Sequence, residues 1–394
     1  GAEYRAYLLS QGLRISTAQR ARNLLTQYLQ SRRPDTYTTC TDRIGWHGRA
    51  FVLPRETIGD DADEAIVFQS EQAIENTFTQ RGTLDQWRDR VGALCVGNSR
   101  LAFAVACAFA GPLLKVVGVE SGGFHFRGGS STGKTTALKV AASVNGGVNY
   151  LQRWRTTDNA LEAIAAQHSD SLLVLDELAQ VDPKTAGECA YMLANEQSKA
   201  RATRNGAPRS RLSWRLLFLS AGELGLSAHM AEGQRRTMTG QEIRMADIPA
   251  DAGAGLGMLE TEHGIEGGGP AFSRQIVEAA SRCYGSPGRA WLHWLTENMA
   301  TLRDDVRQRI QKLANQIIPE TAGGQVHRVG LRFVLVGVAG EMASDAGLTG
   351  WAKGESERAA RVCFNAWMAN RGGAGDGEVS AMLRQVRVFL ESHG

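Results

Sequence analysis

The chain has 394 residues, of which 43% are hydrophobic and 22% charged, and its formal net charge is +3. These fractions are those of an ordinary soluble protein, and they exclude a disordered tail, a fibrous repeat and a disulfide-stapled mini-domain. The length predicts two or three globular units. Because the net charge is small, any surface that binds a polyanion must be local.

The six cysteines are widely spaced and form no C-x-x-C pair, so we expect buried free thiols rather than disulfides or a zinc site. The sequence begins without an initiator methionine or an apolar leader, which indicates a boundary within a longer chain. We expect a cytoplasmic protein.

The first third of the chain mixes helical and strand patterns. Apolar periodicity predicts a helix over 17–30, and alternation predicts a β-hairpin over 43–54. The apolar run over 101–119 is interrupted at Gly111 and its neighbouring proline. A membrane span needs about 20 largely uninterrupted apolar residues, so we predict a buried helix that ends at this glycine. We assign residues 1–120 to an N-terminal α+β, collar-like region.

From residue 121 to 250, short apolar strands alternate with helical segments. This pattern is typical of the α/β class, in which helices cover both faces of a largely parallel sheet. A glycine-rich linker over 251–270 and a helical region over 271–394 are predicted to follow. The predicted strands are 124–126, 148–151, 172–175, 216–219 and 243–248.

Residues 128–135 read Gly-Gly-Ser-Ser-Thr-Gly-Lys-Thr and match the phosphate-loop (Walker A) pattern G-x-x-x-x-G-K-[ST]. The match lies between a predicted strand and a predicted helix, which argues against a coincidental glycine-serine turn. In such a loop the backbone amides surround the phosphates, Lys134 contacts the β and γ oxygens, and the Thr135 hydroxyl binds Mg²⁺. The predicted ATP-binding residues are Gly128, Ser130, Ser131, Thr132, Gly133, Lys134, Thr135 and Thr136.

The aliphatic strand over 172–175 ends in the acidic pair Asp176-Glu177, about 40 residues after the loop. We predict that Asp176 holds Mg²⁺ together with Thr135, and that Glu177 polarises the water that attacks the γ-phosphate. The alternative is an acidic pair that only caps a helix. The pair favours a hydrolysing motor or switch over a small-molecule kinase, whose acceptor would need its own pocket.

The fourth predicted strand is followed by Ser220, our candidate for a side chain that senses the γ-phosphate, with Glu223 as a weaker candidate. A helix N-cap is the alternative role for the serine. Arg235, Arg236 and Arg244 lie between the last two strands and are candidates for an arginine finger that acts on a neighbouring subunit's nucleotide. Solvated surface arginines are the alternative, and a finger would require assembly.

Residues 199–215 contain six basic residues and no acid, around an Asn-Gly turn. We predict a basic hairpin that follows a phosphodiester backbone. The alternatives are a solvated loop, or arginines that face the neighbouring subunit's nucleotide. The predicted nucleic-acid contacts are Lys199, Arg201, Arg204, Arg209 and Arg211.

Several segments of the sequence resemble the domain-of-unknown-function 927 family. They are 45–48 (Gly-Trp-His-Gly), 122–125, 141–146, 159–162, 191–195, 199–201 and 240–244. The resemblance is strongest over 35–250 and extends through 348–351. It implies a helicase of phages, plasmids or integrated elements, often attached to a primase module, and kinship with AAA+ and superfamily 3-like enzymes. That kinship implies an oligomeric ring, expected to be a hexamer, around single-stranded DNA.

Together these features predict a P-loop NTPase core of the AAA+ type that binds ATP and Mg²⁺. Our first hypothesis is a ring-forming, ATP-dependent DNA helicase or translocase that serves the replication of a mobile genetic element. The alternative is an ATP-gated loader or remodelling ATPase that binds DNA without unwinding it. The expected partners are single-stranded DNA, further copies of the chain and a primase module or protein, with no membrane.

Overall fold

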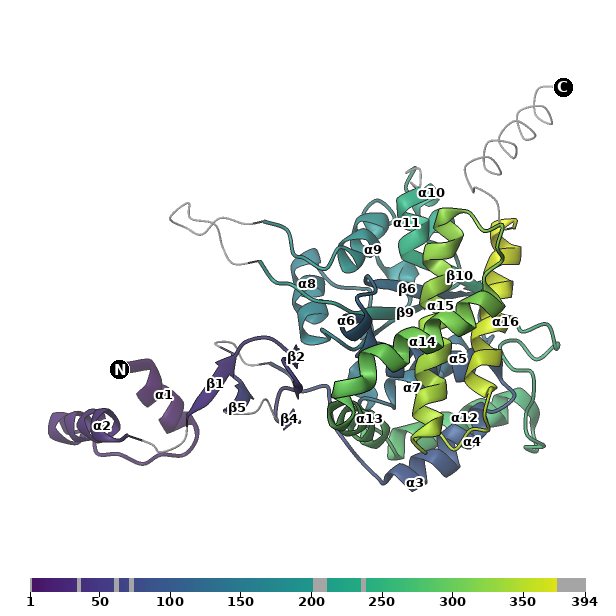
Figure 1. The fold of residues 1–394 in the computed structure, drawn as a ribbon. Coiled ribbons are helices and arrows are strands. Elements are labelled where there is room, and N and C mark those ends of the chain that lie inside the picture. Colours follow the sequence, from purple (N-terminus) through teal and green to yellow (C-terminus); the bar gives the residue numbers. More distant parts are fainter. Residues whose placement is uncertain are drawn as a thin grey trace.

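The computed structural model describes residues 2–33, 37–59, 64–70, 74–200, 211–234 and 239–373. Figure 1 shows a body in which helices enclose a central sheet, and an N-terminal extension, drawn in purple, that projects from one side of the body.

The N-terminal extension contains two helices and two small sheets. Its elements are α1 (Ala2–Ser10), α2 (Gln19–Ser31), β1 (Thr38–Thr41), β2 (Gly45–His47), β3 (Ala50–Val52), β4 (Thr57–Ile58) and β5 (Ala65–Phe68). Strands β2, β3 and β4 are antiparallel, which confirms the predicted hairpin, and β1 pairs with β5 in parallel. The helix predicted over 17–30 corresponds to α2.

The apolar run forms a helix that is buried along its whole length. The short elements α3 (Leu84–Trp87), η1 (Arg88–Gly92) and α4 (Ala93–Cys95) lead into α5 (Ser99–Ala110), and α6 (Leu113–Val117) follows it. Every residue of α5 is buried. The helix ends at Gly111, as predicted, where an added Cβ would lie 2.5 Å from the Ser171 carbonyl carbon. No helix among the described residues is long and apolar enough to cross a bilayer.

All five strands of the central sheet are parallel. They are β6 (Gly122–Arg127), β7 (Leu151–Arg153), β8 (Leu172–Asp176), β9 (Leu217–Gly222) and β10 (Met245–Pro249). Their order across the sheet is β10-β6-β9-β8-β7, so β9 lies between the strand that precedes the phosphate loop and the strand that ends in the acidic pair. This is a P-loop NTPase core with an additional central strand, and the predicted fold class is confirmed.

All five strands differ somewhat from their predicted bounds, and three of these differences have a clear structural cause. A 3₁₀ turn, η2 (Val148–Tyr150), occupies most of the second predicted strand, so β7 begins after it. The helix α11 (Thr239–Arg244) occupies the start of the fifth. β9 runs beyond its predicted end because it lies between two partners, and its pairing with β6 continues to Gly222.

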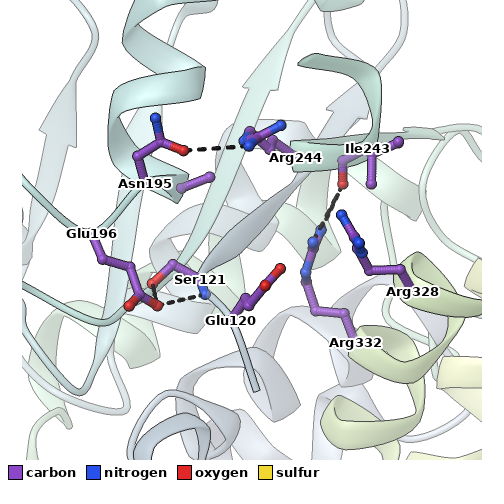
Figure 2. Close-up of a pocket in the computed structure, with 9 residues that line it drawn as sticks. Glu120, Ser121, Asn195, Glu196, Ile243, Arg244, Arg328 and Arg332 are labelled. Carbon is purple, nitrogen blue, oxygen red and sulfur yellow. Dashed lines mark hydrogen bonds between the residues drawn. The ribbon is translucent and has the colours of Figure 1, made fainter. Parts of the chain in front are cut away.

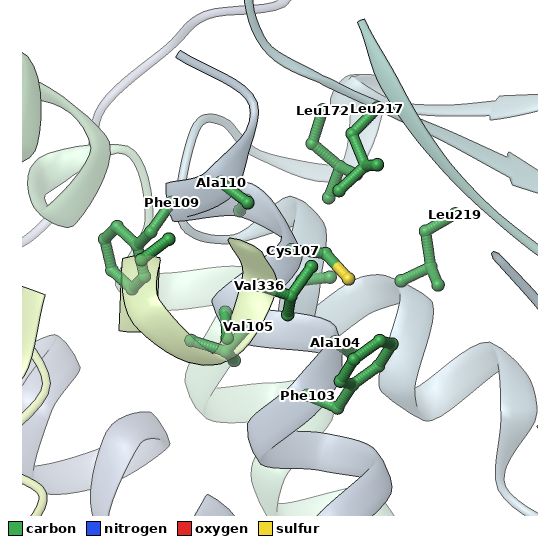
Figure 3. Packing of buried hydrophobic residues seen from close by; sticks show 14 of the residues in the cluster. Phe103, Ala104, Val105, Cys107, Phe109, Ala110, Leu172, Leu217, Leu219 and Val336 are labelled. Atoms are coloured by element: carbon green, nitrogen blue, oxygen red, sulfur yellow. The ribbon is translucent and has the colours of Figure 1, made fainter. Parts of the chain in front are cut away.

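The two faces of the sheet are covered by different helices. One face packs on α5 and on α7 (Lys134–Ala142), and the other on α8 (Asp158–Gln167), α9 (Ala186–Ala194) and α10 (Leu226–Glu232). Because successive strand residues point to opposite faces, Leu217 and Leu219 belong to the first layer and Phe218 to the second. Figure 3 shows both leucines, with Leu172 of β8, around the α5 helix.

Five C-terminal helices complete the first layer. They are α12 (Gly268–Arg282), α13 (Ser286–Glu297), α14 (Met299–Ile317), α15 (Gly324–Asp345) and α16 (Glu355–Arg371). The ring of Phe333 on α15 lies 4.6 Å from the ring of Phe124 on β6 and 5.3 Å from that of Phe103 on α5. A single buried cluster therefore crosses the predicted boundaries at residues 120 and 250, which do not separate independent cores.

The six cysteines are free thiols, as predicted. Five are buried, and Cys40 on β1 is exposed, so the expectation of burial is wrong for this residue.

Candidate nucleotide-binding site

The phosphate loop lies at the carboxyl edge of the sheet, between β6 and α7. Its backbone is left-handed at Ser131 (φ 62°) and at Gly133 (φ 97°), and the second position favours glycine because no Cβ is present to clash. Gly133 is the N-cap of α7, and no side chain caps the first turn of that helix. The unpaired N–H groups of a helix N-terminus attract anions, so the loop has the backbone chemistry of a phosphate site.

Lys134 folds back across the loop. Its Nζ donates hydrogen bonds to the carbonyl oxygens of Gly128 (2.7 Å) and Gly129 (2.5 Å). Burial lowers the pKa of Lys134 from its usual value, and the carboxylates of Glu223 and Asp176 offset part of that shift. The ammonium group is therefore held inside the loop and within the field of two acids.

The acid that ends β8 meets the first helical turn after the loop. The Thr135 hydroxyl lies 3.2 Å from Oδ2 of Asp176 and 3.5 Å from Oδ1. A hydroxyl beside a carboxylate is an oxygen donor set that suits Mg²⁺. The described residues contain no group of three or more His, Cys, Asp or Glu that could hold a metal. A cation here would complete its coordination with water and phosphate oxygens, as Mg²⁺ commonly does.

Glu177 is one of the few non-glycine residues with a left-handed backbone, at φ 59°. This conformation costs on the order of 1–3 kcal/mol and is found most often at functional sites. The turn exposes the Glu177 side chain at the sheet edge, where its carboxylate accepts a hydrogen bond from Gln180 Nε2. The predicted water-activating acid is thus at the same edge as the phosphate loop.

The other residues predicted to bind ATP form the rim of the loop. Ser130 and Ser131 are exposed, and Thr136 is half-buried in the first turn of α7. The Thr132 hydroxyl donates to the Gly129 carbonyl at 3.0 Å, which closes the loop on itself. Their contacts with a nucleotide stay predictions.

Arg244 lies at the opposite edge of the sheet. It ends α11, and the next residue, Met245, pairs with Gly123 at the start of β6. The five strand residues that separate this edge from the phosphate loop span about 16 Å. Arg244 therefore cannot serve as a finger for its own chain's phosphate loop. The other two candidates, Arg235 and Arg236, lie outside the described residues.

A pocket of about 220 Å³ surrounds Arg244 at the amino edge (Figure 2). The Arg244 guanidinium lies 4.0 Å from the centre of the Tyr191 ring and donates to Asn195 Oδ1 at 3.3 Å. Beside it, Arg332 of α15 is buried and donates to the Ile243 carbonyl at 3.2 Å. Burial lowers the pKa of Arg332 to about 10. The exposed side chain of Arg328 forms the outer wall of this arginine-rich pocket.

The base of the predicted basic hairpin is an antiparallel pair. Gln197 pairs with Ser213, and the Ser198 amide donates to the Leu212 carbonyl at 2.9 Å. Lys199 is half-exposed and its Nζ forms an ion pair with Asp158 Oδ2 at 2.8 Å. Arg211 is also exposed. The other predicted nucleic-acid contacts, Arg201, Arg204 and Arg209, lie outside the described residues.

Residues 1–212, more than half of the chain, match the family described as Domain of unknown function (DUF927). The chain belongs to the DUF927 family. A comparison with curated protein sequences finds no match.

Among solved structures, the DUF927 chain is similar to "SCCmec type IV Cch - active helicase", with a TM-score of 0.59 and 16% sequence identity. The alignment covers 95% of this chain and 63% of that one, so this chain spans less than two thirds of the helicase's length. At this identity the likeness concerns the fold. The ADP complex of NtrX from Brucella abortus aligns at a TM-score of 0.23 and 15% identity over 72% of this chain and 66% of its own, which is too weak to support an argument.

Ser220 of the DUF927 chain does not lie at the strand tip, in contrast to the prediction. Its hydroxyl is buried inside the sheet, where it accepts from Trp154 Nε1 at 2.8 Å and lies 3.0 Å from His125 Nδ1. His125 Nε2 is 3.0 Å from the Leu224 carbonyl, which can only accept. The imidazole therefore donates from Nε2, and its Nδ1 accepts the serine proton. The result is a one-directional hydrogen-bond chain from Trp154 to the loop after β9.

The residue that does follow the strand tip is Glu223, which is exposed and acts on the pKa of Lys134. Sequence analysis ranked it second because the predicted strand ended too early. No local pattern marks the true tip, because β9 continues only through its pairing with β6, which joins Gly222 to Arg127.

Sequence analysis also missed the contact that supports the phosphate loop from behind. Within the segment predicted to be a linker, the amide of the buried Met258 donates to the Thr132 carbonyl at 2.9 Å. Glycines in the segment suggested flexibility, but an isolated methionine among them is a signal of packing.

Proposed function

We propose that this chain is an ATP-hydrolysing motor that assembles into a ring, expected to be a hexamer, and translocates along or unwinds DNA. Replication of a phage, plasmid or integrated element, together with a primase module or protein, is the setting that the DUF927 resemblance implies. Under this proposal residues 1–120 form a collar, 121–250 the motor core and 271–394 its helical support.

The observation that carries the proposal is the contact between Thr135 and Asp176 at the mouth of an intact phosphate loop. Residues 41 positions apart in sequence meet there only because β9 and β8 follow β6 in the sheet. With Lys134 on one side and Glu177 on the other, the groups expected to bind the phosphates and Mg²⁺ and to activate water lie at one sheet edge.

Each residue of that edge has a distinct proposed role. The loop amides and Lys134 bind the phosphates, and Thr135 and Asp176 would hold Mg²⁺, which supplies charge neutralisation at the transferring phosphoryl group. Glu177 accepts a proton from the attacking water as the bond to the γ-phosphorus forms, and the β-phosphate oxygen leaves with the bonding electrons. The carboxylate of Glu223 raises the pKa of Lys134, and Glu223 replaces Ser220 as the proposed γ-phosphate sensor.

The arginine that completes the site is proposed to come from a neighbouring subunit. Arg244 can act only in this way, since it lies at the other edge of its own sheet. Arg235 and Arg236 remain candidates for the same role. The assembly this requires is heterologous, with the amino edge of one copy against the carboxyl edge of the next, and such contacts form a ring when the rotation between copies closes.

The basic hairpin over 199–215 is proposed to contact single-stranded DNA. Its antiparallel base projects from the end of α9, so nucleotide-dependent movement of the core would move it. Lys199 can exchange its ion pair with Asp158 for a phosphate, because exposed ion pairs are worth little in water. Arg211, and the arginines at 201, 204 and 209, would add salt-sensitive contacts.

A second candidate function is an ATP-gated loader that binds or remodels DNA without separating strands. A fork-shaped DNA with a labelled strand separates the two. We expect single-stranded DNA to stimulate ATP turnover by the chain, and the chain to release the labelled strand when ATP is present. The Lys134→Ala variant should show neither effect. ATP-dependent binding without strand release would favour the loader. ATP turnover that does not change when DNA is added, together with no strand release, would contradict both functions.

A further inference from the structure

The N-terminal arm, defined as residues 2–33, has a charge unlike the rest of the chain. Between Tyr4 and Pro34 there are six arginines and no acidic residue, although the whole chain carries a net charge of only +3. The arginines are Arg5, Arg14, Arg20, Arg22, Arg32 and Arg33. The basic character of the protein is therefore concentrated at one end.

The arm packs on nothing that buries its side chains. No residue of α2 is buried, and Tyr4, Tyr7 and Tyr28 keep 46%, 60% and 53% of their surface exposed. On α2 the helical period places Leu24 and Tyr28 on one stripe. The same period places Arg20 on this stripe, one turn before Leu24, and the exposed Arg32 lies against Tyr28 at its other end.

The arm's arginines are available for a partner. None of them forms an ion pair with the described residues, and the guanidinium of Arg32 lies 4.7 Å from the centre of the Tyr28 ring. Exposed arginines interleaved with exposed aromatic rings are the side-chain combination that binds single-stranded nucleic acid, because arginines neutralise phosphates while bases stack on the rings.

We propose that the N-terminal arm is a second binding surface for single-stranded nucleic acid, separate from the 199–215 hairpin. Arg20 and Arg32 contact the phosphates on the face that carries Tyr28, and Tyr28 supplies a platform on which a base stacks. In Figure 1 the arm and the base of the hairpin extend toward the same side of the body.

The composition of the arm favours a nucleic acid over two other partners. Two arms packed against each other would bring twelve arginines together with only the two copies of Glu3 to balance them, which is repulsive. The arm contains no tryptophan or phenylalanine, and α2 is only 13 residues long, so its apolar face offers few of the groups that anchor interfacial helices in lipid.

The test uses the full chain, an end-labelled oligothymidylate, no nucleotide and a salt titration read by fluorescence anisotropy. Removing both phosphate contacts in the Arg20→Ala/Arg32→Ala variant should reduce the slope of log affinity against log salt by about 1.4. The control is Arg303→Ala/Arg307→Ala, which removes two exposed arginines of α14 and should leave the slope unchanged. Tyr28→Ala should weaken binding roughly 5- to 150-fold, and Tyr28→Phe should keep it.

Equal affinity and slope in the parent and in both arm variants would overturn the proposal. So would arm variants that lose binding to anionic phospholipid vesicles, or lose self-association by sedimentation, while binding the oligonucleotide normally. The Lys134→Ala variant should retain the arm-dependent binding. Loss of ATP turnover without loss of this binding would leave the arm proposal standing even if the motor proposal fails.

Discussion

The two edges of the central sheet carry different sets of charged groups. The carboxyl edge holds the phosphate loop with Lys134, and the acids Asp176, Glu177 and Glu223. The amino edge holds Arg244 in an arginine-rich pocket and has no phosphate-binding loop among its described residues. Since the length of β6 keeps them apart, a single chain cannot unite the two, and under the proposed function neighbouring copies would share the chemistry.

The largest effect on ATP turnover should come from two variants, each of which removes one half of the proposed shared site. Lys134→Ala and Arg244→Ala should each lower ATP turnover about 100-fold or more, the first by removing phosphate binding and the second by removing a charge from the neighbour's site. Mixed in equal amounts, the two inactive variants should recover turnover, since about a quarter of the interfaces then join an intact lysine to an intact arginine.

Steady-state ATPase assays of each variant and of the mixture measure this. Lys139→Ala, an exposed lysine on the same helix α7, is the control and should behave as the parent. If the mixture is no more active than either variant alone, Arg244 is not the arginine finger, and Arg235 and Arg236 remain the candidates.

The next largest effect should come from a variant of Glu177 at the carboxyl edge, which distinguishes nucleotide binding from hydrolysis. Glu177→Gln should lower kcat on the order of 100-fold, because the amide cannot accept the proton of water, while nucleotide affinity stays within a few-fold of the parent. Single-turnover kinetics and binding of a fluorescent ATP analogue measure the two quantities. Glu188→Gln, at an exposed position on α9, is the matched control. If nucleotide affinity fell together with kcat, Glu177 would be a binding residue.

The support beneath the carboxyl edge should show in the pH dependence of stability. Burial lowers the pKa of His125 to about 4, against 6.5 in an unfolded chain. The unfolded state binds the proton first, so this contribution is complete above pH 6.5 and is lost as the pH falls toward 4. At pH 5 the loss is roughly 2 kcal/mol.

Urea unfolding at pH 7 and pH 5 measures that loss, and His125→Gln should lack it. His293→Gln, an exposed histidine on α13, should show the same difference between the two pH values as the parent. His168 is also buried with its pKa lowered to about 4, so a part of the pH dependence remains in either variant. Identical pH dependence in His125→Gln and the parent would contradict a neutral imidazole at this position.

The smallest effect should come from the acid beside the phosphate-loop lysine. Glu223 raises the pKa of Lys134, so Glu223→Gln should let the lysine lose its proton at a lower pH. The alkaline limb of the pH profile of kcat/KM should then move toward neutrality, with turnover at pH 7 changed only a few-fold. Glu223→Asp should keep the parent profile. An unchanged alkaline limb would show that this carboxylate is too distant or too well solvated to matter.

The carboxyl edge was more predictable from sequence than the amino edge, for a physical reason. The phosphate loop and the Asp176-Glu177 pair are local patterns, set by a turn and by the end of a strand, so sequence spacing alone placed them. The β-hairpin and the buried α5 were also correctly predicted, since each depends on neighbouring residues only. The position of Arg244 opposite the phosphate loop depends on which strands pair, and no local pattern reports that pairing.

Ser220 shows most clearly what could not be predicted from the sequence. A serine after four apolar residues fits a strand end, yet β9 has partners on both sides and continues to Gly222. Its burial against Trp154 and His125 joins three elements that are distant in sequence. The family resemblance was predictable because it rests on short exact segments, and it was confirmed.

The hydrogen bond from the Met258 amide to the Thr132 carbonyl ties the phosphate loop to the only covalent route into the C-terminal helices. Met258 is anchored in the core, and α12 begins ten residues later, at Gly268. A shift of the phosphate loop that breaks or tilts this hydrogen bond would therefore also act on the segment that leads into α12. The glycine-rich stretch therefore provides a short physical connection between the phosphate loop and the C-terminal helices.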